Sequence, residues 1–187
     1  AKLEQVVIVL DELATGLDDA GELQTALAFA EPQGRYDVAN ILTTAKADGD
    51  GWVIDGKKSM VFNGGNADLL VIPARTSGGQ SDADGISLFA VAADDDGVSV
   101  QAYPTVDGHH AADVELQNVR VGADALLGDA DKAFDVLDAV MDEATLAVSA
   151  EAIGIMQVLK DKTIAYSKER VQFGVPIGSF QALQHRM

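Results

Sequence analysis

The residues best suited to chemistry stand near the end of the chain, where Arg170, Phe173 and Gln181 surround a turn rich in glycine and proline. A guanidinium and an amide at the break between two helices can both donate hydrogen bonds to a phosphate. Structural roles are open for each of them: an arginine at a helix end is commonly solvated or caps carbonyl groups, a glutamine can cross-link helices, and a phenylalanine can pack. The segment is therefore a candidate phosphate site, and the alternative is that these three residues only stabilise the fold.

The composition argues against several classes of function. The 187 residues include 30 acidic and 13 basic side chains, for a formal net charge of -17, which repels nucleic acid and anionic lipid. The lack of cysteine excludes disulfides, thiolate nucleophiles and cysteine-ligated metals. His109, His110 and His185 have no carboxylate at ligand spacing on a shared helix face, so no metal site is predicted, and the first two are expected on an exposed turn.

The chain also lacks the signals of a membrane or secreted protein. No apolar run approaches the roughly 18 residues that span a bilayer, and no basic region followed by an apolar one opens the sequence. We therefore expect a cytoplasmic protein that contacts neither membrane nor nucleic acid.

Three stretches of different pattern divide the chain. Apolar residues at helical spacing between positions 3 and 17 predict one amphipathic helix. From Leu27 to Val121, short runs with β-branched residues alternate with turn residues, which predicts an antiparallel β-barrel or sandwich. We expect a hairpin turn at Asp48-Gly49-Asp50-Gly51, Trp52 in the core, and strands over residues 38–45, 52–54, 69–74, 86–92, 98–103 and 114–121.

A different pattern follows Gly128, where glycine and proline become rare. Apolar residues such as Phe134, Leu137 and Met141 recur every three or four positions, which predicts one helix from about Asp131 to Lys168. Such a helix greatly exceeds the usual length of about 11–12 residues. It must therefore pack in a bundle or against another subunit.

The motifs along the chain, in their order, resemble those of the acyl-CoA dehydrogenases. Residues 28–37, Ala-Phe-Ala-Glu-Pro-Gln-Gly-Arg-Tyr-Asp, are similar to the family's TEP..GSD segment. Residues 50–58 and 61–68 resemble its G..Y.ING.K..ITNG..AD hairpin, and residues 119–128 resemble its V.VP...LLG exit into the helical domain. The closing spacing E-R-x-x-F-G-x-x-x-x-x-F-Q, residues 169–181, resembles the signature that holds FAD. Within the family, residues 31–37, 107–113 and 180–187 most resemble the branch that contains small subunits of pimeloyl-CoA dehydrogenase.

The resemblance implies an α+β multidomain fold. Residues 1–26 would be a remnant of the N-terminal helical domain, residues 27–128 the middle β-domain, here an antiparallel barrel or sandwich, and residues 129–187 the first helices of a C-terminal helical domain.

The resemblance also implies FAD as the cofactor. Arg170 would hold the FAD pyrophosphate of a neighbouring subunit, with Phe173 packing beside it and Gln181 at the adenosine end. Tyr36 would stand beside the substrate. The isoalloxazine would be lined, partly through backbone groups, by Leu27, Phe29, Ala30, Met60, Val61 and Phe62.

No catalytic residue is assigned. The family's usual glutamate base lies beyond Met187, and the position on the long helix where some members carry the base is Ala144. Ala30, Tyr36, Met60 and Phe62 also replace the threonine, serine, tryptophan and hydroxyl residue of many members, and Thr145 replaces an arginine that attends the acyl-CoA. The sequence therefore leaves open whether this subunit holds FAD itself, and which acyl chain it accepts.

Three hypotheses of function follow. The first is FAD-dependent α,β-dehydrogenation of an acyl-CoA thioester in fatty acid β-oxidation, by a homo- or hetero-oligomer that passes electrons to an electron-transfer flavoprotein. The second is a non-catalytic partner subunit of a heteromeric acyl-CoA dehydrogenase. The third is a scaffold domain without flavin.

Overall fold

The computed structural model describes residues 23–186, so the helix predicted over residues 3–17 lies outside the described residues. The chain divides into two compact units, the first ending at Ala139 and the second beginning at Val140.

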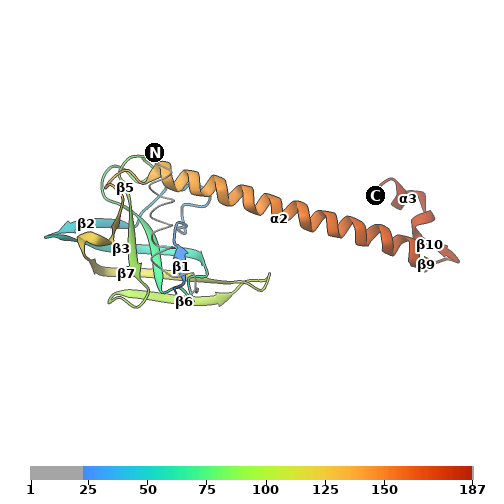
Figure 1. The fold of residues 1–187 in the computed structure, drawn as a ribbon, viewed down its shortest axis with the longest axis horizontal. Helices are drawn as coiled ribbons and strands as arrows, with labels where there is room; N and C mark the ends of the chain where they lie inside the picture. Colours follow the sequence, from blue (N-terminus) through green and yellow to red (C-terminus); the bar gives the residue numbers. More distant parts are fainter. Residues whose placement is uncertain (1–22, 187) are drawn as a thin grey trace. The chain divides into compact units, whose positions relative to one another are not determined.

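An eight-stranded sheet builds the first unit (Figure 1). The strand order is β6-β7-β3-β2-β4-β5-β8, with β1 beside β4. Most neighbouring strands are antiparallel, as predicted. The exceptions involve β4, which pairs in parallel with β1 and, at the single residue pair Thr44 and Arg75, with β2. The strands are β1 (Thr25–Leu27), β2 (Thr44–Asp48), β3 (Gly51–Phe62), β4 (Leu69–Arg75), β5 (Ile86–Ala92), β6 (Val98–Pro104), β7 (His110–Val121) and β8 (Leu126–Leu127).

The core of this unit lies along the inner faces of β3, β4, β5 and β7. Ile54, Leu70, Ile72 and Phe89 are all fully buried there. Trp52 is half-buried and meets the ring of Phe89 edge to face, with 5.3 Å between the ring centroids. This confirms the predicted core position of Trp52. The predicted turn also forms, because β2 ends at Asp48 and β3 begins at Gly51.

The strand predicted over residues 38–45 is wrong in its first part, since β2 begins only at Thr44. The buried guanidinium of Arg75 binds the carbonyl oxygen of Ala39 at 2.7 Å. It also binds carbonyl oxygens of the β4–β5 loop at 2.8 to 2.9 Å, those of Gln80, Asp82 and Asp84. In the segment before Thr44, Arg75 thus binds the Ala39 carbonyl, and the Glu31 carboxylate accepts the amides of Leu42 and Thr43. Because side chains bind these backbone groups, they have no need of a strand partner.

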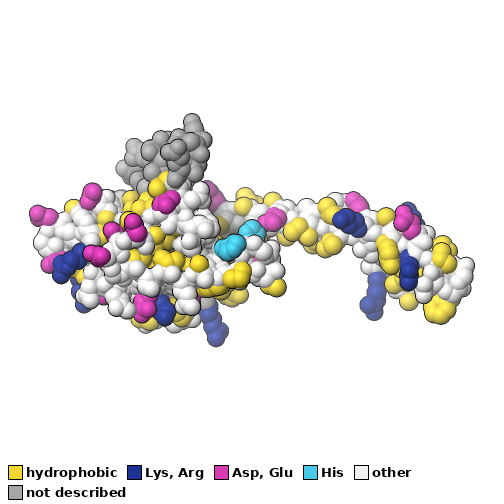
Figure 2. All heavy atoms as spheres, turned by 90° about the horizontal axis from the view of Figure 1, so that it is seen from below, with side chains coloured by type: hydrophobic (Ala, Val, Ile, Leu, Met, Phe, Trp, Pro, Cys, Tyr) yellow, Lys and Arg dark blue, Asp and Glu magenta, His cyan; other side chains and the backbone are white. Residues whose placement is uncertain are grey.

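The predicted long helix is confirmed as α2 (Phe134–Glu169). From Leu146 onward it exposes large apolar side chains, among them Ile153 and Met156 (Figure 2). Its predicted packing in a bundle or against a subunit remains a prediction. Between residues 23 and 186, no helix is long and apolar enough to cross a bilayer. After α2 come β9 (Val171–Gln172), β10 (Val175–Pro176), the 3₁₀ turn η2 (Ile177–Ser179) and α3 (Gln181–Gln184).

Candidate cofactor site

The first unit brings the two predicted flavin-lining segments together. The amide N–H of Ser59 on β3 donates to the carbonyl oxygen of Ala30 at 2.9 Å. The amide N–H of Ala28 donates to the carbonyl of Val71 on β4, also at 2.9 Å, and so fixes the other side of the first segment. Residues 27–30 and the strand that leads into residues 60–62 are therefore tied together at Ala30 and Ser59, and these two segments make up the candidate flavin surface.

The side chains on this surface differ in exposure. Met60 and Phe62 are each 55% exposed, whereas Val61 between them is 2% exposed and belongs to the core. Leu27, Phe29 and Ala30 are half-buried. Val61 could therefore meet a cofactor only through its backbone, while Met60 and Phe62 offer apolar side chains. Tyr36 is fully exposed on the loop before β2.

A buried ion pair joins the same two segments and was missed by the sequence reasoning. The Lys58 ammonium donates to Glu31 Oε1 and to the carbonyl oxygen of Pro73, each at 2.7 Å. The two side chains are 0% and 2% exposed. Glu31 also accepts hydrogen bonds from the amides of Leu42 at 2.7 Å and Thr43 at 3.1 Å. One carboxylate thus holds the loop that follows Ala30 against the strand that precedes Met60.

The electrostatics of this pair are those of an ammonium and a carboxylate removed from water. Burial lowers the pKa of Lys58 from 10.5 to about 8, although the charge of Glu31 opposes the shift. Burial alone would raise the pKa of Glu31, but the charge and hydrogen bond of Lys58 outweigh it and hold that pKa below its ordinary value. Both groups are therefore charged at neutral pH.

The second unit presents the other predicted residues on a tight hairpin. Phe173 and Gly174 form its two-residue loop, with φ angles of 53° and 82°. Positive φ at both positions is the geometry of a type I′ turn. Phe173 is 94% exposed, and its ring meets Phe180 edge to face at 6.2 Å. Left-handed backbone is uncommon for so bulky a residue, and the ring is open to solvent apart from its contact with Phe180.

Arg170 and Gln181 flank this hairpin, and both side chains are exposed. The Arg170 carbonyl accepts the amide N–H of Ile177 at 2.8 Å, which closes the base of the hairpin. Gln181 is the first residue of α3. The structure therefore places Arg170, Phe173 and Gln181 around one turn, as the sequence predicted, with donor groups open to solvent.

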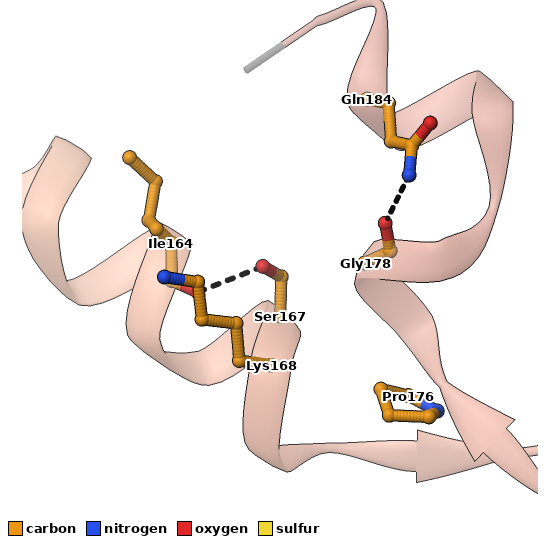
Figure 3. Close-up of a pocket in the computed structure, with 6 residues that line it drawn as sticks. All are labelled: Ile164, Ser167, Lys168, Pro176, Gly178 and Gln184. Atoms are coloured by element: carbon orange, nitrogen blue, oxygen red, sulfur yellow. Dashed lines mark hydrogen bonds between the residues drawn. The ribbon is translucent and has the colours of Figure 1, made fainter.

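A pocket lies between the end of α2 and the segment from β10 to α3 (Figure 3). The Gln184 amide donates to the Gly178 carbonyl at 2.9 Å, and the Ser167 hydroxyl donates to the Ile164 carbonyl at 2.8 Å. These polar groups are satisfied within the protein, and Arg170, Phe173 and Gln181 do not line the pocket. It does not coincide with the predicted phosphate donors. Its lining residues are Ile164, Ser167, Lys168, Pro176, Gly178 and Gln184.

Metal binding finds no support in the part of the chain that the structure describes. No group of three or more histidine and acidic side chains gathers there in a geometry that could hold an ion. His109 and His110 are both exposed, as predicted, but only His109 lies outside a strand, since His110 is the first residue of β7.

Comparison with known proteins identifies the family. A profile described as "Acyl-CoA dehydrogenase, middle domain" matches residues 26–119. A second, "Acyl-CoA dehydrogenase, C-terminal domain", matches residues 131–187. The chain belongs to the acyl-CoA dehydrogenase family. The family assignment and the fold expected from the motifs are thereby confirmed.

Individual acyl-CoA dehydrogenases show the same likeness. The probable acyl-CoA dehydrogenase FadE25 of Mycobacterium tuberculosis is 35% identical over 160 residues, 84% of this chain and 41% of the relative. The crystal structure of an acyl-CoA dehydrogenase from Geobacillus kaustophilus matches with a TM-score of 0.82 and 35% identity, over 89% of this chain and 45% of that one. A glutaryl-CoA dehydrogenase from Mycobacterium smegmatis in complex with FADH2 matches with a TM-score of 0.78 and 27% identity, over 89% and 42%. The chain thus spans less than half the length of these proteins.

Proposed function

We propose that the chain is part of a FAD-dependent acyl-CoA dehydrogenase that introduces an α,β double bond into a CoA thioester. The observation that carries the proposal is the surface formed by residues 27–30 and 60–62, joined by the hydrogen bond from Ser59 to Ala30. When bound, FAD supplies the hydride acceptor for such a reaction. The base that takes the α-proton would come from outside residues 1–187.

The residues of the first unit fit a flavin through backbone and apolar contacts. Met60 and Phe62 expose apolar side chains beside each other, and a flat aromatic ring system buries such side chains favourably. Hydroxyl contacts common in the family are replaced at Ala30 and Phe62. This chain would therefore hold the ring system mainly by shape and by backbone hydrogen bonds.

The residues of the second unit fit the phosphate end of FAD. The Arg170 guanidinium is exposed and can donate two parallel hydrogen bonds to a pyrophosphate oxygen pair. Phe173 would pack beside the phosphates and Gln181 would reach the adenosine. We place this contact in a neighbouring subunit's site, so the enzyme would be a homo- or hetero-oligomer, a dimer or tetramer.

The remaining parts of the proposal concern the substrate, the electron acceptor and the cellular location. Tyr36 would contact the acyl-CoA, and an electron-transfer flavoprotein would take the electrons from the reduced flavin. The relatives' names support an acyl-CoA as substrate. We place the reaction in fatty acid β-oxidation in the cytoplasm.

The proposal is tested by whether the protein binds flavin and whether an acyl-CoA reduces it. The purified protein is expected to carry the visible absorbance of oxidised flavin, and an acyl-CoA is expected to bleach it. Arg170→Ala should lower FAD retention about 10-fold or more, since a charge-assisted contact is worth about 1.5–3 kcal/mol. Arg186→Ala is the matched control, as a second arginine of the same unit. Equal retention in Arg170→Ala and the parent protein would refute the phosphate contact.

A second candidate function is a non-catalytic partner subunit of a heteromeric acyl-CoA dehydrogenase. The substitutions at Ala30, Tyr36, Met60 and Phe62 favour it, because they alter the family's flavin and substrate contacts together. Bleaching by acyl-CoA that occurs only after co-expression with a second subunit would favour this candidate. A protein that never holds flavin, alone or with a partner, would favour a scaffold domain instead.

A further inference from the structure

The β3 strand carries an extra residue at the point where it reaches the proposed flavin surface. Lys58 pairs with Val114 of β7, but Val61 pairs with Ala112. Between these two pairs, β3 advances by three residues and β7 by only two. The extra residue on β3 defines a β-bulge at Ser59 and Met60. Met60 has a φ of 52°, in the left-handed region that a methionine rarely adopts.

This bulge decides which side chains face outward. Side chains alternate along a regular strand, so the buried Lys58 would place Met60 and Phe62 in the core and Val61 at the surface. The observed order is the reverse: Val61 is buried, and Met60 and Phe62 are exposed. The extra residue therefore creates the apolar surface.

Two side chains from the neighbouring strands hold the bulge. Asp113 stands opposite it on β7, and its Oδ1 accepts the amide N–H of Met60 at 3.2 Å. The hydroxyl of Tyr103, on β6, donates to the same oxygen at 3.1 Å. The bulge removes the Met60 amide from the regular ladder, and the Asp113 carboxylate supplies its hydrogen-bond acceptor.

A second bulge in the same pair of strands provides an internal comparison. Asn118 on β7 has a φ of 52° beside the register shift between Ile54 and Gly56. Its amide N–H donates to Asp55 Oδ1 on β3 at 2.8 Å. Asparagine tolerates left-handed backbone more readily than methionine does. The Met60 bulge therefore depends more on its carboxylate partner.

We propose that Asp113 and Tyr103 are positioning residues, here called the Asp113 clamp, which hold Met60 in left-handed backbone and so turn Met60 and Phe62 toward the cofactor. The role of this surface rests on the proposed function, whereas the clamp itself acts in the protein with or without flavin.

The first experiment measures amide hydrogen exchange by NMR in the full chain without flavin. Asp113→Ala should speed exchange of the Met60 amide about 10-fold or more, as loss of a charge-assisted hydrogen bond predicts. Asp113→Asn retains an acceptor oxygen and should keep the rate within about 3-fold of the parent. Asp55→Ala is the matched control: it should speed exchange at Asn118 and leave Met60 unchanged.

The second experiment titrates FAD into the same variants. Asp113→Ala should raise the FAD dissociation constant about 10-fold and Tyr103→Phe about 3-fold, while Asp113→Asn and Asp55→Ala leave it near the parent value. Unchanged Met60 exchange in folded Asp113→Ala overturns the proposal. So does an equal loss of FAD affinity in Asp55→Ala, which would indicate general destabilisation. A parent protein that binds no FAD refutes the proposed function instead, and the Met60 exchange rate still decides whether the clamp exists.

Discussion

The Met60 bulge and the Phe173 hairpin both present a bulky apolar side chain from left-handed backbone, and they are held in place by different means. Met60 is fixed by Asp113, which lies 53 positions away in the chain, beside an ion pair whose members are 27 positions apart. Phe173 is fixed by its own turn, within the six residues from Val171 to Pro176. The first surface is a product of tertiary structure, and the second is almost entirely local.

This difference has consequences for how each surface responds to change. Removing one member of the buried Glu31–Lys58 pair leaves the other buried without compensation, so that loss should destabilise the first unit as a whole. Loss of the Asp113 contact should act at the Met60 bulge, because this contact lies at the surface. Substitutions at the two-residue turn should affect binding with little effect on folding, because the residues around it keep their own backbone hydrogen bonds.

The largest effect is expected from Glu31→Ala. It leaves the Lys58 ammonium buried without its counter-ion and the amides of Leu42 and Thr43 without an acceptor. Loss of one member of a buried pair typically costs about 3–5 kcal/mol. Urea unfolding followed by the fluorescence of Trp52, the single tryptophan of the chain, measures the free energy of unfolding of the first unit.

The exposed ion pair between Arg120 and Asp48 is the matched control for that experiment. Asp48→Ala should cost less than about 1 kcal/mol, because both side chains are solvated. The double variant Glu31→Gln with Lys58→Met should be more stable than Glu31→Ala, since it leaves no buried charge. Equal losses for Glu31→Ala and Asp48→Ala would show that the buried pair is not an anchor.

A smaller effect, of opposite sign, is expected from Phe173→Asn. Asparagine followed by Gly174 is the pair that a type I′ turn favours, so the hairpin should gain up to about 1 kcal/mol. The amide of Ile177, which closes the hairpin at 2.8 Å from the Arg170 carbonyl, should exchange more slowly. FAD retention should fall at the same time. Faster exchange at Ile177 would contradict a turn that is held by local geometry.

The smallest effect is expected at Asp131, a half-buried long-range anchor at the start of the helical segment. The hydroxyls of Thr76 and Ser77 donate to its carboxylate at 2.7 and 2.8 Å, and they lower its pKa below 3.8. A lowered pKa adds stability above pH 3.8, and that stability is lost as the pH falls through the folded-state pKa. Asp131→Asn should remove this part of the acid dependence, less than about 1 kcal/mol, in urea unfolding at a series of acid pH values. An unchanged pH profile would contradict the assignment.

Local patterns account for what could be predicted from the sequence. β4, β5 and the long helix follow from runs and periods of apolar residues, and the turns at Asp48–Gly51 and Phe173–Gly174 follow from residue types at fixed spacing. No local pattern marks Tyr103 and Asp113, because these residues and Met60 lie on three different strands and meet only in the folded sheet. Lys58 could have been noticed as a charged residue in an apolar strand that requires a buried partner. Alternation read forward from Ile54 points Lys58 inward, and it fails only at the bulge that follows, before Val61.

The hydrogen bonds of the Arg75 guanidinium also predict which sequence changes the 76–85 loop can tolerate. Each oxygen that it binds in the 76–85 loop and at Ala39 belongs to the main chain, and every amino acid carries such an oxygen. Substitutions at Gln80, Asp82 and Asp84 therefore leave the contacts of Arg75 intact, whereas an insertion or deletion would carry the carbonyls out of reach. Among relatives, we expect these three positions to vary in residue type while the loop keeps its length.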